Sequence, residues 1–281
     1  MILYYNIIRG DRSMKDIIKI DRLNFDYKKN IVFKNLSLNI KEGSFTTVLG
    51  LNGSGKTTLI KLILGLVRGN AVVIYDGLPV TADNLKSFRR EIGVVYDNMN
   101  QNFVAETVKD EIPFTLENIN MPREDIEKRV NEISNKLKIK KILEENPYSL
   151  NANDKWLVSL ASALIINPKI LIIDNGFSGL NYKTLENVLK VLSEYKEKGM
   201  TILCATNNVE EALYGDAVIV LDSGKVILNG SVEDVFKEEE VLDEIGIELP
   251  FVVSLSSKLK LYNLLKENYY SLDKLVDALW K

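Results

Sequence analysis

Apolar and polar residues follow two periods along this chain, and the periods alternate. From Met14 onward, Ile18 and Ile20 alternate with polar residues, and the pattern continues through Leu23, Phe25 and Tyr27. Alternation of period two predicts a half-buried strand. Residues 34–40 (KNLSLNI) and 45–50 (FTTVLG) predict two more strands, and residues 57–66 (TTLIKLILGL) carry apolar residues at helical spacing.

The same alternation continues through the second half of the chain. Residues 71–77 and 89–97 are interpreted as strands around a turn, 170–174 (ILIID) as a buried strand and 201–206 (TILCAT) as another. Helices are predicted over 122–141, over 154–166 up to Asn167-Pro168, and over 184–199. Strands that alternate with helices indicate an α/β fold whose mostly parallel sheet is covered on both faces.

The pattern also divides the chain into parts. Residues 14–97 and 166–222 carry the strand and helix alternation, whereas 98–165 read as helical throughout and are predicted to be an insertion. Residues 223–281 restart with a strand and short helices, which predicts a small C-terminal domain. Residues 1–13 lack a pattern, and we interpret them as an extension outside the fold, with translation starting at Met14.

Composition narrows the possible functions. The 281 residues are 46% hydrophobic and 27% charged, with a net charge of −3, which argues against a nucleic-acid-binding face. The single Cys204 fits a reducing cytosol. No apolar run reaches the roughly 18 residues that cross a bilayer. The chain has no histidine, which excludes any mechanism that uses imidazole as base or metal ligand.

Residues 50–57 (GLNGSGKT) match the pattern G-x-x-x-x-G-K-[ST] of a phosphate-binding loop. Such a loop turns backbone N–H groups toward phosphate oxygens, its lysine meets the β- and γ-phosphates, and its threonine offers a hydroxyl to Mg²⁺. A chance match to a glycine-rich turn is the alternative. The position between a predicted strand and a predicted helix favours phosphate binding. The candidate nucleotide residues in this stretch are Gly50, Asn52, Gly53, Ser54, Gly55, Lys56, Thr57 and Thr58.

Asp174 ends the apolar run 170–173 and is a candidate ligand for the same ion. In P-loop proteins, a strand-end aspartate after an apolar run helps hold the Mg²⁺ that bridges the phosphates. A helix cap or turn acid is the alternative for an isolated aspartate. With the loop upstream, we expect Thr57 and Asp174 to share Mg²⁺.

These motifs together resemble the ATP-binding cassette (ABC) family, and the resemblance covers almost the whole chain from Met14. Residues 98–118 and 244–259 are similar to segments of the ATPases of energy-coupling-factor (ECF) transporters, especially the first of the paired components. The resemblance implies a RecA-like, ABC-type P-loop NTPase core with a helical (signature) subdomain and a C-terminal domain that contacts a dimer partner. It also implies that Tyr27 stacks on adenine, although Leu23, Phe25 and Tyr27 could equally line one buried strand face.

The sequence departs from the resembled family where the family cleaves ATP. Asn175 stands at the position of the catalytic glutamate, Asn207 at the position of the switch histidine, and Asp97 at the position of the Q-loop glutamine, where it could still approach Mg²⁺. The D-loop acid is replaced by Asn181. The signature LSGGQ is replaced by Leu150, Asn151, Ala152, Asn153 and Asp154. The sequence therefore predicts a chain that binds ATP and Mg²⁺ but hydrolyses ATP poorly.

The resemblance also implies partners and a location. Two cassettes of this family close head to tail, so an unlike second ATPase with intact motifs is expected as a heterodimer partner. A membrane-embedded coupling subunit and a substrate-binding membrane subunit are expected at the cytoplasmic face of the membrane, where the complex would import a vitamin or other micronutrient. Two alternatives stay open: a non-hydrolysing pseudoenzyme that regulates or scaffolds a transporter, and a soluble ABC protein without a membrane partner.

Overall fold

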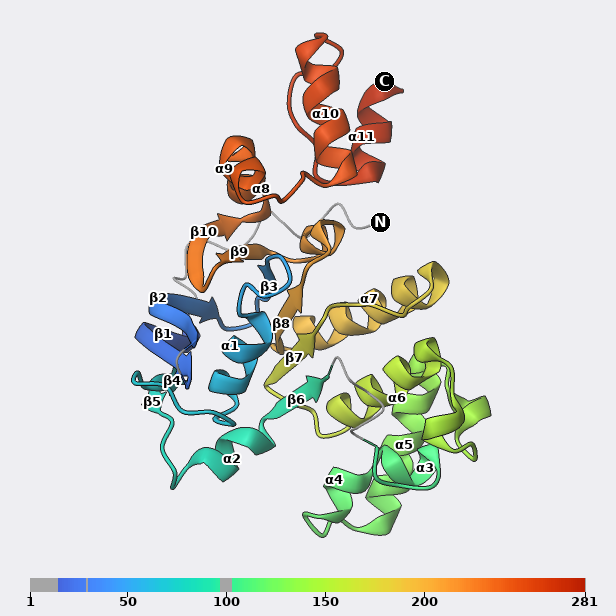
Figure 1. Cartoon of the computed structure of the whole chain (residues 1–281). Coiled ribbons are helices and arrows are strands. Elements are labelled where there is room, and N and C mark those ends of the chain that lie inside the picture. The colour runs from blue at the N-terminus through green and yellow to red at the C-terminus, as the bar shows by residue number, and fades with distance from the viewer. Residues whose placement is uncertain (1–14, 29, 97–102, 281) are drawn as a thin grey trace.

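The computed structural model describes residues 15–28, 30–96 and 103–280 (Figure 1). The interpretation of residues 1–13 as an extension, and the role expected of Asp97, therefore lie outside the described residues. Among the described helices, none combines the length and apolarity needed to span a bilayer.

A six-stranded sheet forms the centre of the molecule, in the order β10-β9-β3-β8-β7-β6. Its members are β3 (Phe45–Leu49), β6 (Ile92–Val95), β7 (Ile170–Asp174), β8 (Thr201–Thr206), β9 (Ala217–Asp222) and β10 (Lys225–Ser231). All pairings are parallel except β9 with β10. Every residue of β3, β7 and β8 is buried, as expected for parallel strands covered on both faces. The predicted parallel α/β core is confirmed.

A second sheet is antiparallel and has the order β2-β1-β4-β5. It consists of β1 (Asp16–Tyr27), β2 (Asn30–Lys41), β4 (Val73–Tyr75) and β5 (Leu78–Pro79). Helix α1 (Lys56–Ile63) buries Leu59, Ile60 and Ile63 in a hydrophobic core that includes residues of both sheets. The prediction of a mostly parallel sheet does not cover this second sheet, because periodicity identifies strands but not their pairing partners.

The predicted start of the strand at residue 89 needs correction, and the predicted division after residue 222 falls within a hairpin. Residues 89–97 were read as a strand, but Arg89 and Arg90 end helix α2 (Leu85–Arg90), and β6 begins at Ile92. The division after residue 222 separates β9 from β10, which pair as a hairpin through Asp222 and Lys225. Ser223 and Gly224 both have positive φ, at 46° and 73°, so they make the tight turn that joins these strands.

The helical insertion covers one end of the parallel sheet (Figure 1). Its helices are α3 (Val108–Glu111), α4 (Phe114–Glu117), α5 (Arg123–Leu137) and α6 (Ala152–Leu164). Helix α5 ends four residues before the predicted end at residue 141, because Lys138 takes a left-handed conformation with φ 61°. The insertion shares one apolar core with β7, β8 and helix α7 (Tyr182–Glu197).

The C-terminal helices lie at the opposite end of the molecule from α4 and α6 (Figure 1). They are α8 (Val232–Phe236), α9 (Glu239–Glu244), α10 (Phe251–Leu261) and α11 (Leu272–Leu279). Their core includes residues of β9 and of the 3-10 helix η4 (Val209–Tyr214). This part of the chain is therefore packed on the edge of the central sheet.

Candidate functional site

The loop at residues 50–55 connects β3 to α1 and is fixed by backbone hydrogen bonds to the strands around it. The N–H of Gly50 donates to the carbonyl of Thr206 at 3.2 Å, and the N–H of Gly224 donates to the carbonyl of Ser54 at 3.1 Å. Within the loop, the N–H of Ser54 donates to the carbonyl of Leu51 at 3.2 Å. The loop is thus held between the end of β8 and the β9–β10 turn.

Two glycines in this loop are required by close packing. A Cβ on Gly50 would lie 2.2 Å from the carbonyl oxygen of Leu221, and a Cβ on Gly55 would lie 2.7 Å from the ring of Phe33. Gly53 has φ +84°, and apart from its chain neighbours no atom of the described residues lies within 4 Å of the position of a Cβ there. The backbone can therefore approach a ligand closely at Gly53.

Lys56 stands at the first turn of α1 and turns its side chain back over the loop. Its Nζ donates to the carbonyl of Gly50 at 2.7 Å and to the carbonyl of Leu51 at 3.0 Å. Burial lowers the pKa of Lys56, while the nearby charge of Asp174 opposes this shift. Within the part of the chain that the structure describes, no side chain caps the N-terminus of α1, and the first turn of this helix has no acidic residue. The helix end and the ammonium group together form a site for an anion.

Thr57 and Asp174 bring two oxygens together beside this site. The hydroxyl of Thr57 donates to Oδ1 of Asp174 at 3.1 Å. Asp174 is the last residue of β7 and is buried. The described residues contain no cluster of three or more carboxylate or thiol side chains that could enclose a metal ion. One hydroxyl and one carboxylate fit Mg²⁺, which usually takes one or two protein carboxylates and completes its shell with waters and phosphates.

Asn175 and Asn207 directly follow the ends of β7 and β8, and Asn207 contacts the phosphate loop. Asn175 has φ 67°, a left-handed conformation in which asparagine is favoured over most residues. The Nδ2 group of Asn207 donates to Oδ1 of Asn52 at 3.1 Å. The structure therefore brings the predicted loop residues, Asp174 and Asn207 together at the carboxyl end of the parallel strands.

Glu211 is a buried carboxylate next to this site, and no pattern in the sequence indicates its burial. Its Oε1 accepts a hydrogen bond from the N–H of Phe177 at 3.2 Å, which fixes the turn after Asn175. A Cβ on Gly176 would lie 1.8 Å from Oε2 of Glu211, so only glycine fits there. Burial raises the pKa of Glu211. The pair Glu210-Glu211 reads in the sequence like an ordinary solvated stretch, so the buried position could not be inferred.

The five predicted signature residues surround the N-terminus of α6. Leu150 is buried, and Asn151 caps the helix by accepting from the N–H of Asp154 at 3.0 Å. Asn153 contacts the segment after β7: its Oδ1 accepts from the backbone N–H of Asn181 at 3.3 Å and from Nδ2 of Asn181 at 3.0 Å. The structure therefore joins the signature positions to Asn181.

Tyr27 lies at the end of β1 and is 42% exposed, whereas Leu23 and Phe25 are buried. These three residues therefore do not form one buried face. The ring of Tyr27 packs edge-on against Phe25 with centroids 4.8 Å apart. This contact leaves a face of the tyrosine ring available for stacking.

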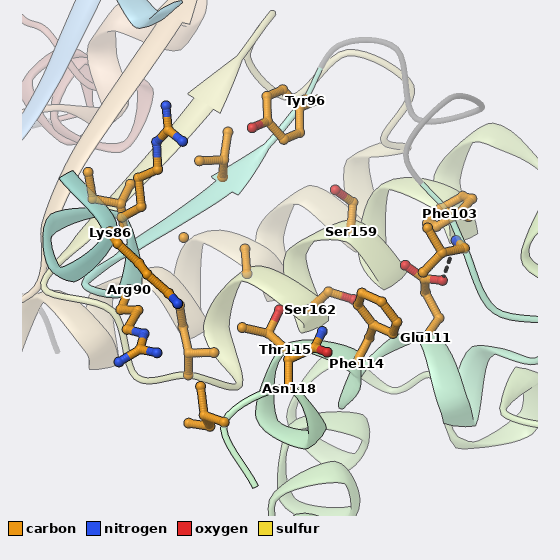
Figure 2. Close-up of a pocket in the computed structure, with 18 of the residues that line it drawn as sticks. Lys86, Arg90, Tyr96, Phe103, Glu111, Phe114, Thr115, Asn118, Ser159 and Ser162 are labelled. Atoms are coloured by element: carbon orange, nitrogen blue, oxygen red, sulfur yellow. Dashed lines mark hydrogen bonds between the residues drawn. The ribbon is translucent and has the colours of Figure 1, made fainter. Parts of the chain in front are cut away.

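A groove of about 900 Å³ lies between the central sheet and the helical insertion (Figure 2). Lys86 and Arg90 of α2 line one wall, and Phe114, Thr115 and Asn118 line the other. The groove exposes apolar side chains: Val104 is exposed by 62%, Phe114 and Ile119 by 44% each, and Tyr96 by 36%. Several residues of the ECF-like stretch 98–118 line this groove, namely Phe103, Val104, Glu111, Phe114, Thr115 and Asn118, whereas the contribution of α2 could not be inferred from the sequence.

Comparison with known proteins gives consistent matches. The family model "ABC transporter" matches residues 33–178. The energy-coupling factor transporter ATP-binding protein EcfA1 of Mycoplasmoides gallisepticum is 34% identical over 88% of this chain and 89% of that protein. The EcfA1 protein of Ligilactobacillus salivarius is also 34% identical, over 94% of this chain and 95% of that protein.

Solved structures of ABC transporter ATPases also resemble the fold of this chain. The structure of cbiO1 from Clostridium perfringens, part of the ABC transporter complex cbiONQ, has a TM-score of 0.73 and 30% identity, and covers 86% of this chain and 100% of that chain. A dimeric ATP-binding cassette in a post-hydrolysis state with ADP and Pi has a TM-score of 0.69 and 27% identity, over 76% of this chain and 98% of that chain.

Proposed function

This chain belongs to the ABC transporter family, and we propose that it is the ATP-binding subunit of an ECF-type importer that holds Mg·ATP but cleaves it slowly. Its similarity to ECF ATP-binding proteins over most of both chains supports the ECF assignment. The proposal depends above all on the Thr57–Asp174 contact beside an uncapped helix end, because this pair joins the phosphate loop to a candidate Mg²⁺ ligand.

ATP binding is supported by the geometry of the loop. Lys56 is held over the loop by two carbonyl groups, and it would exchange these bonds for the stronger charge-assisted bonds of a phosphate. Gly53 leaves room for phosphate next to the backbone. Mg²⁺ held by Thr57 and Asp174 would neutralise charge on the phosphate oxygens. Tyr27, exposed at the end of β1, is available to stack on the adenine.

Slow hydrolysis is supported by the groups next to Asp174. Asn175 presents an amide, which can orient a water molecule but cannot accept its proton, so general-base catalysis of roughly 10²–10⁴-fold is lost. Asn207 provides an amide that bonds to Asn52, and the chain has no histidine that could replace the switch residue. Glu211, the buried carboxylate beside this site, has its Oε1 oxygen engaged by the N–H of Phe177.

We further propose an unlike ATPase subunit as the dimer partner. In a head-to-tail pair, the signature positions 150–154 would face the nucleotide of the partner, and Asp154 would place a carboxylate near its phosphates. A homodimer would repeat these changes in both sites, which favours a partner with intact motifs. The C-terminal helices would add to the contact, since Leu261, Tyr262 and Trp280 are exposed by 80%, 78% and 85%.

The groove between α2 and α4 is our proposed contact for a membrane-embedded coupling subunit. It lies at the end of the molecule opposite α10 and α11, so the two proposed interfaces do not compete (Figure 1). Exposed apolar residues at Val104, Phe114 and Ile119 would be covered in such a contact. A separate membrane subunit would bind the vitamin or other micronutrient, and the complex would lie at the cytoplasmic face of the membrane.

A non-hydrolysing regulator or scaffold of the transporter is the second candidate, and the amides at Asn175 and Asn207 favour it. The two candidates are separated by purifying the native complex with its membrane proteins and measuring ATP turnover with Lys56→Ala in this chain alone. If this chain hydrolyses ATP, Lys56→Ala should clearly lower the ATP turnover of the complex. Unchanged turnover would assign hydrolysis to the partner, and failure to recover any membrane protein would contradict the transporter assignment.

A further inference from the structure

The N-termini of helices α6 and α7 are joined through a chain of asparagine side chains. Asn151 caps α6 through the N–H of Asp154, and Asn181 caps α7 by accepting from the N–H of Thr184 at 3.0 Å. Asn153, in the first turn of α6, connects the two caps, since its Oδ1 accepts from both the backbone N–H and Nδ2 of Asn181, 28 residues away. The two helix starts therefore form one hydrogen-bonded unit.

The orientation of the Asn153 amide is determined by its partners. The backbone N–H of Asn181 can only donate, so the group that faces it must be the oxygen Oδ1. The Nδ2 group then points to Oδ1 of Asp154, at 3.2 Å. The Nδ2 group of Asn151 donates to the other oxygen of Asp154 at 2.9 Å. The side-chain amides of Asn151, Asn153 and Asn181 thus all form hydrogen bonds through both their oxygen and their nitrogen. The carboxylate of Asp154 accepts from two of them, Asn151 and Asn153.

A second contact joins α6 to residues 176–181, the segment that follows Asn175, at a point nearer to the nucleotide site. The Nε1 group of Trp156 donates to the carbonyl of Gly176 at 3.3 Å, and its ring lies 5.7 Å from that of Phe177. Gly176 directly follows Asn175, so residues 176–181 are attached to α6 at both ends. A displacement of the Asp174–Asn175 turn would therefore be transmitted through these contacts to the N-terminus of α6.

We propose that Asn153 is a positioning residue that fixes residues 176–181 to α6, so that the chain's own nucleotide site and its signature positions move together. This rests on the proposed function, because it assumes that Mg·ATP binds beside Asp174. The resembled signature has glycine at position 153, which has no side chain to accept from Asn181. The asparagine therefore adds a connection that a glycine cannot make.

The test compares amide hydrogen exchange, resolved by residue with NMR, in the full chain and three variants. Asn153→Ala removes the acceptor of the Asn181 N–H, so exchange at Asn181 should become about five-fold faster, as for loss of one net hydrogen bond. Asn153→Asp keeps an Oδ1 acceptor for Asn181 but loses the Nδ2 donor to Asp154, so its rate should lie closer to the native rate than that of Asn153→Ala. Asn187→Ala is the matched control: it removes the bond from Nδ2 of Asn187 in α7 to the carbonyl of Lys136 and should not affect Asn181.

Adding Mg·ATP tests the coupled movement. In the native chain, exchange should slow both at residues 174–181 and at residues 152–156, whereas in Asn153→Ala the slowing at 152–156 should fall to less than half. An unchanged Asn181 rate, or an unchanged response at 152–156 in Asn153→Ala, would overturn the proposal. If Mg·ATP left residues 50–57 unaffected, the proposed function would fail instead, and the nucleotide-free rates at Asn181 would still decide whether Asn153 holds the segment.

Discussion

The hydroxyl of Thr57 donates to the carboxylate of Asp174 at 3.1 Å, although 117 residues separate them in the chain. This contact joins the helix that follows the phosphate loop to the end of the central strand β7. It places two oxygens where a magnesium ion could bridge them to the phosphates. The contact therefore turns two separate sequence motifs into one site.

Removing the charge of Asp174 should weaken only the magnesium-dependent part of ATP binding. Asp174→Asn keeps the size of the side chain but loses an anionic ligand, so ATP affinity with Mg²⁺ should fall roughly ten-fold or more. Affinity in EDTA should change little. Isothermal titration with and without Mg²⁺ measures both values, and Thr57→Ser, which keeps the hydroxyl, is the matched control. An equal loss under both conditions would contradict the magnesium role.

Lys56→Ala should weaken ATP binding by about 10- to 100-fold, since it removes a charge-assisted bond to phosphate. Lys61→Ala is a suitable control, because Lys61 lies on the same helix and is exposed. Its backbone carbonyl accepts from the N–H groups of Leu66 and Val67, but among the described residues its side chain makes no hydrogen bond or ion pair. A fluorescent ATP analogue would report both affinities. Native affinity in Lys56→Ala would show that the nucleotide binds elsewhere.

Asn175→Glu alone should not restore full ATP turnover. A glutamate would supply a base, but Asn207 still lacks the imidazole of the family's switch histidine. The left-handed conformation at residue 175, with φ 67°, should also cost a glutamate about 1–2 kcal/mol of folding stability. This expectation is tested by measuring ATP turnover and thermal unfolding of three variants: Asn175→Glu, Asn207→His and the double variant. Full activity in the single variant would show that the other changes are tolerated.

Glu211 should make folding stability depend on pH. Because burial raises its pKa in the folded state, the unfolded chain loses this proton first as pH rises above the ordinary value of 4.5. The free energy of unfolding should therefore fall as pH rises from 4.5 to the raised pKa of Glu211. Above that pKa, Glu211 should cause no further change in stability. Glu211→Gln can still accept from Phe177 and should lack this fall. Thermal unfolding of the native protein and of Glu211→Gln is measured between pH 4.5 and 8. If the stability of both proteins changed with pH in the same way, the raised pKa of Glu211 would be contradicted.

The sequence predicted the parts of the site that depend on local chemistry. Loop 50–57 and Asp174 could be predicted because glycine spacing and a buried strand-end acid are local signals, and the structure brings them together at 3.1 Å. The contact between Asn207 and Asn52 crosses 155 residues, so no local pattern could indicate it. The same reason explains why the Asn153–Asn181 bond was not foreseen.

The errors in the fold have a related cause. The antiparallel sheet was missed because β1 and β4 are joined by pairing of Ile18 with Tyr75, which periodicity does not encode. The predicted division after residue 222 falls at the Ser223-Gly224 hairpin turn that joins β9 to β10. Glu211 was missed because its burial depends on packing under Gly176, which is set by the tertiary fold.

The central claim, firm binding of Mg·ATP with slow cleavage, is tested most directly by a single-turnover experiment. Purified chain in excess is mixed with radiolabelled ATP and Mg²⁺, separated from free nucleotide, and the bound nucleotide is identified over time. We predict that ATP is retained and remains mostly uncleaved over many minutes, with Lys56→Ala retaining little. Rapid conversion of the bound ATP to ADP by this chain alone, or no retained nucleotide at all, would contradict the account.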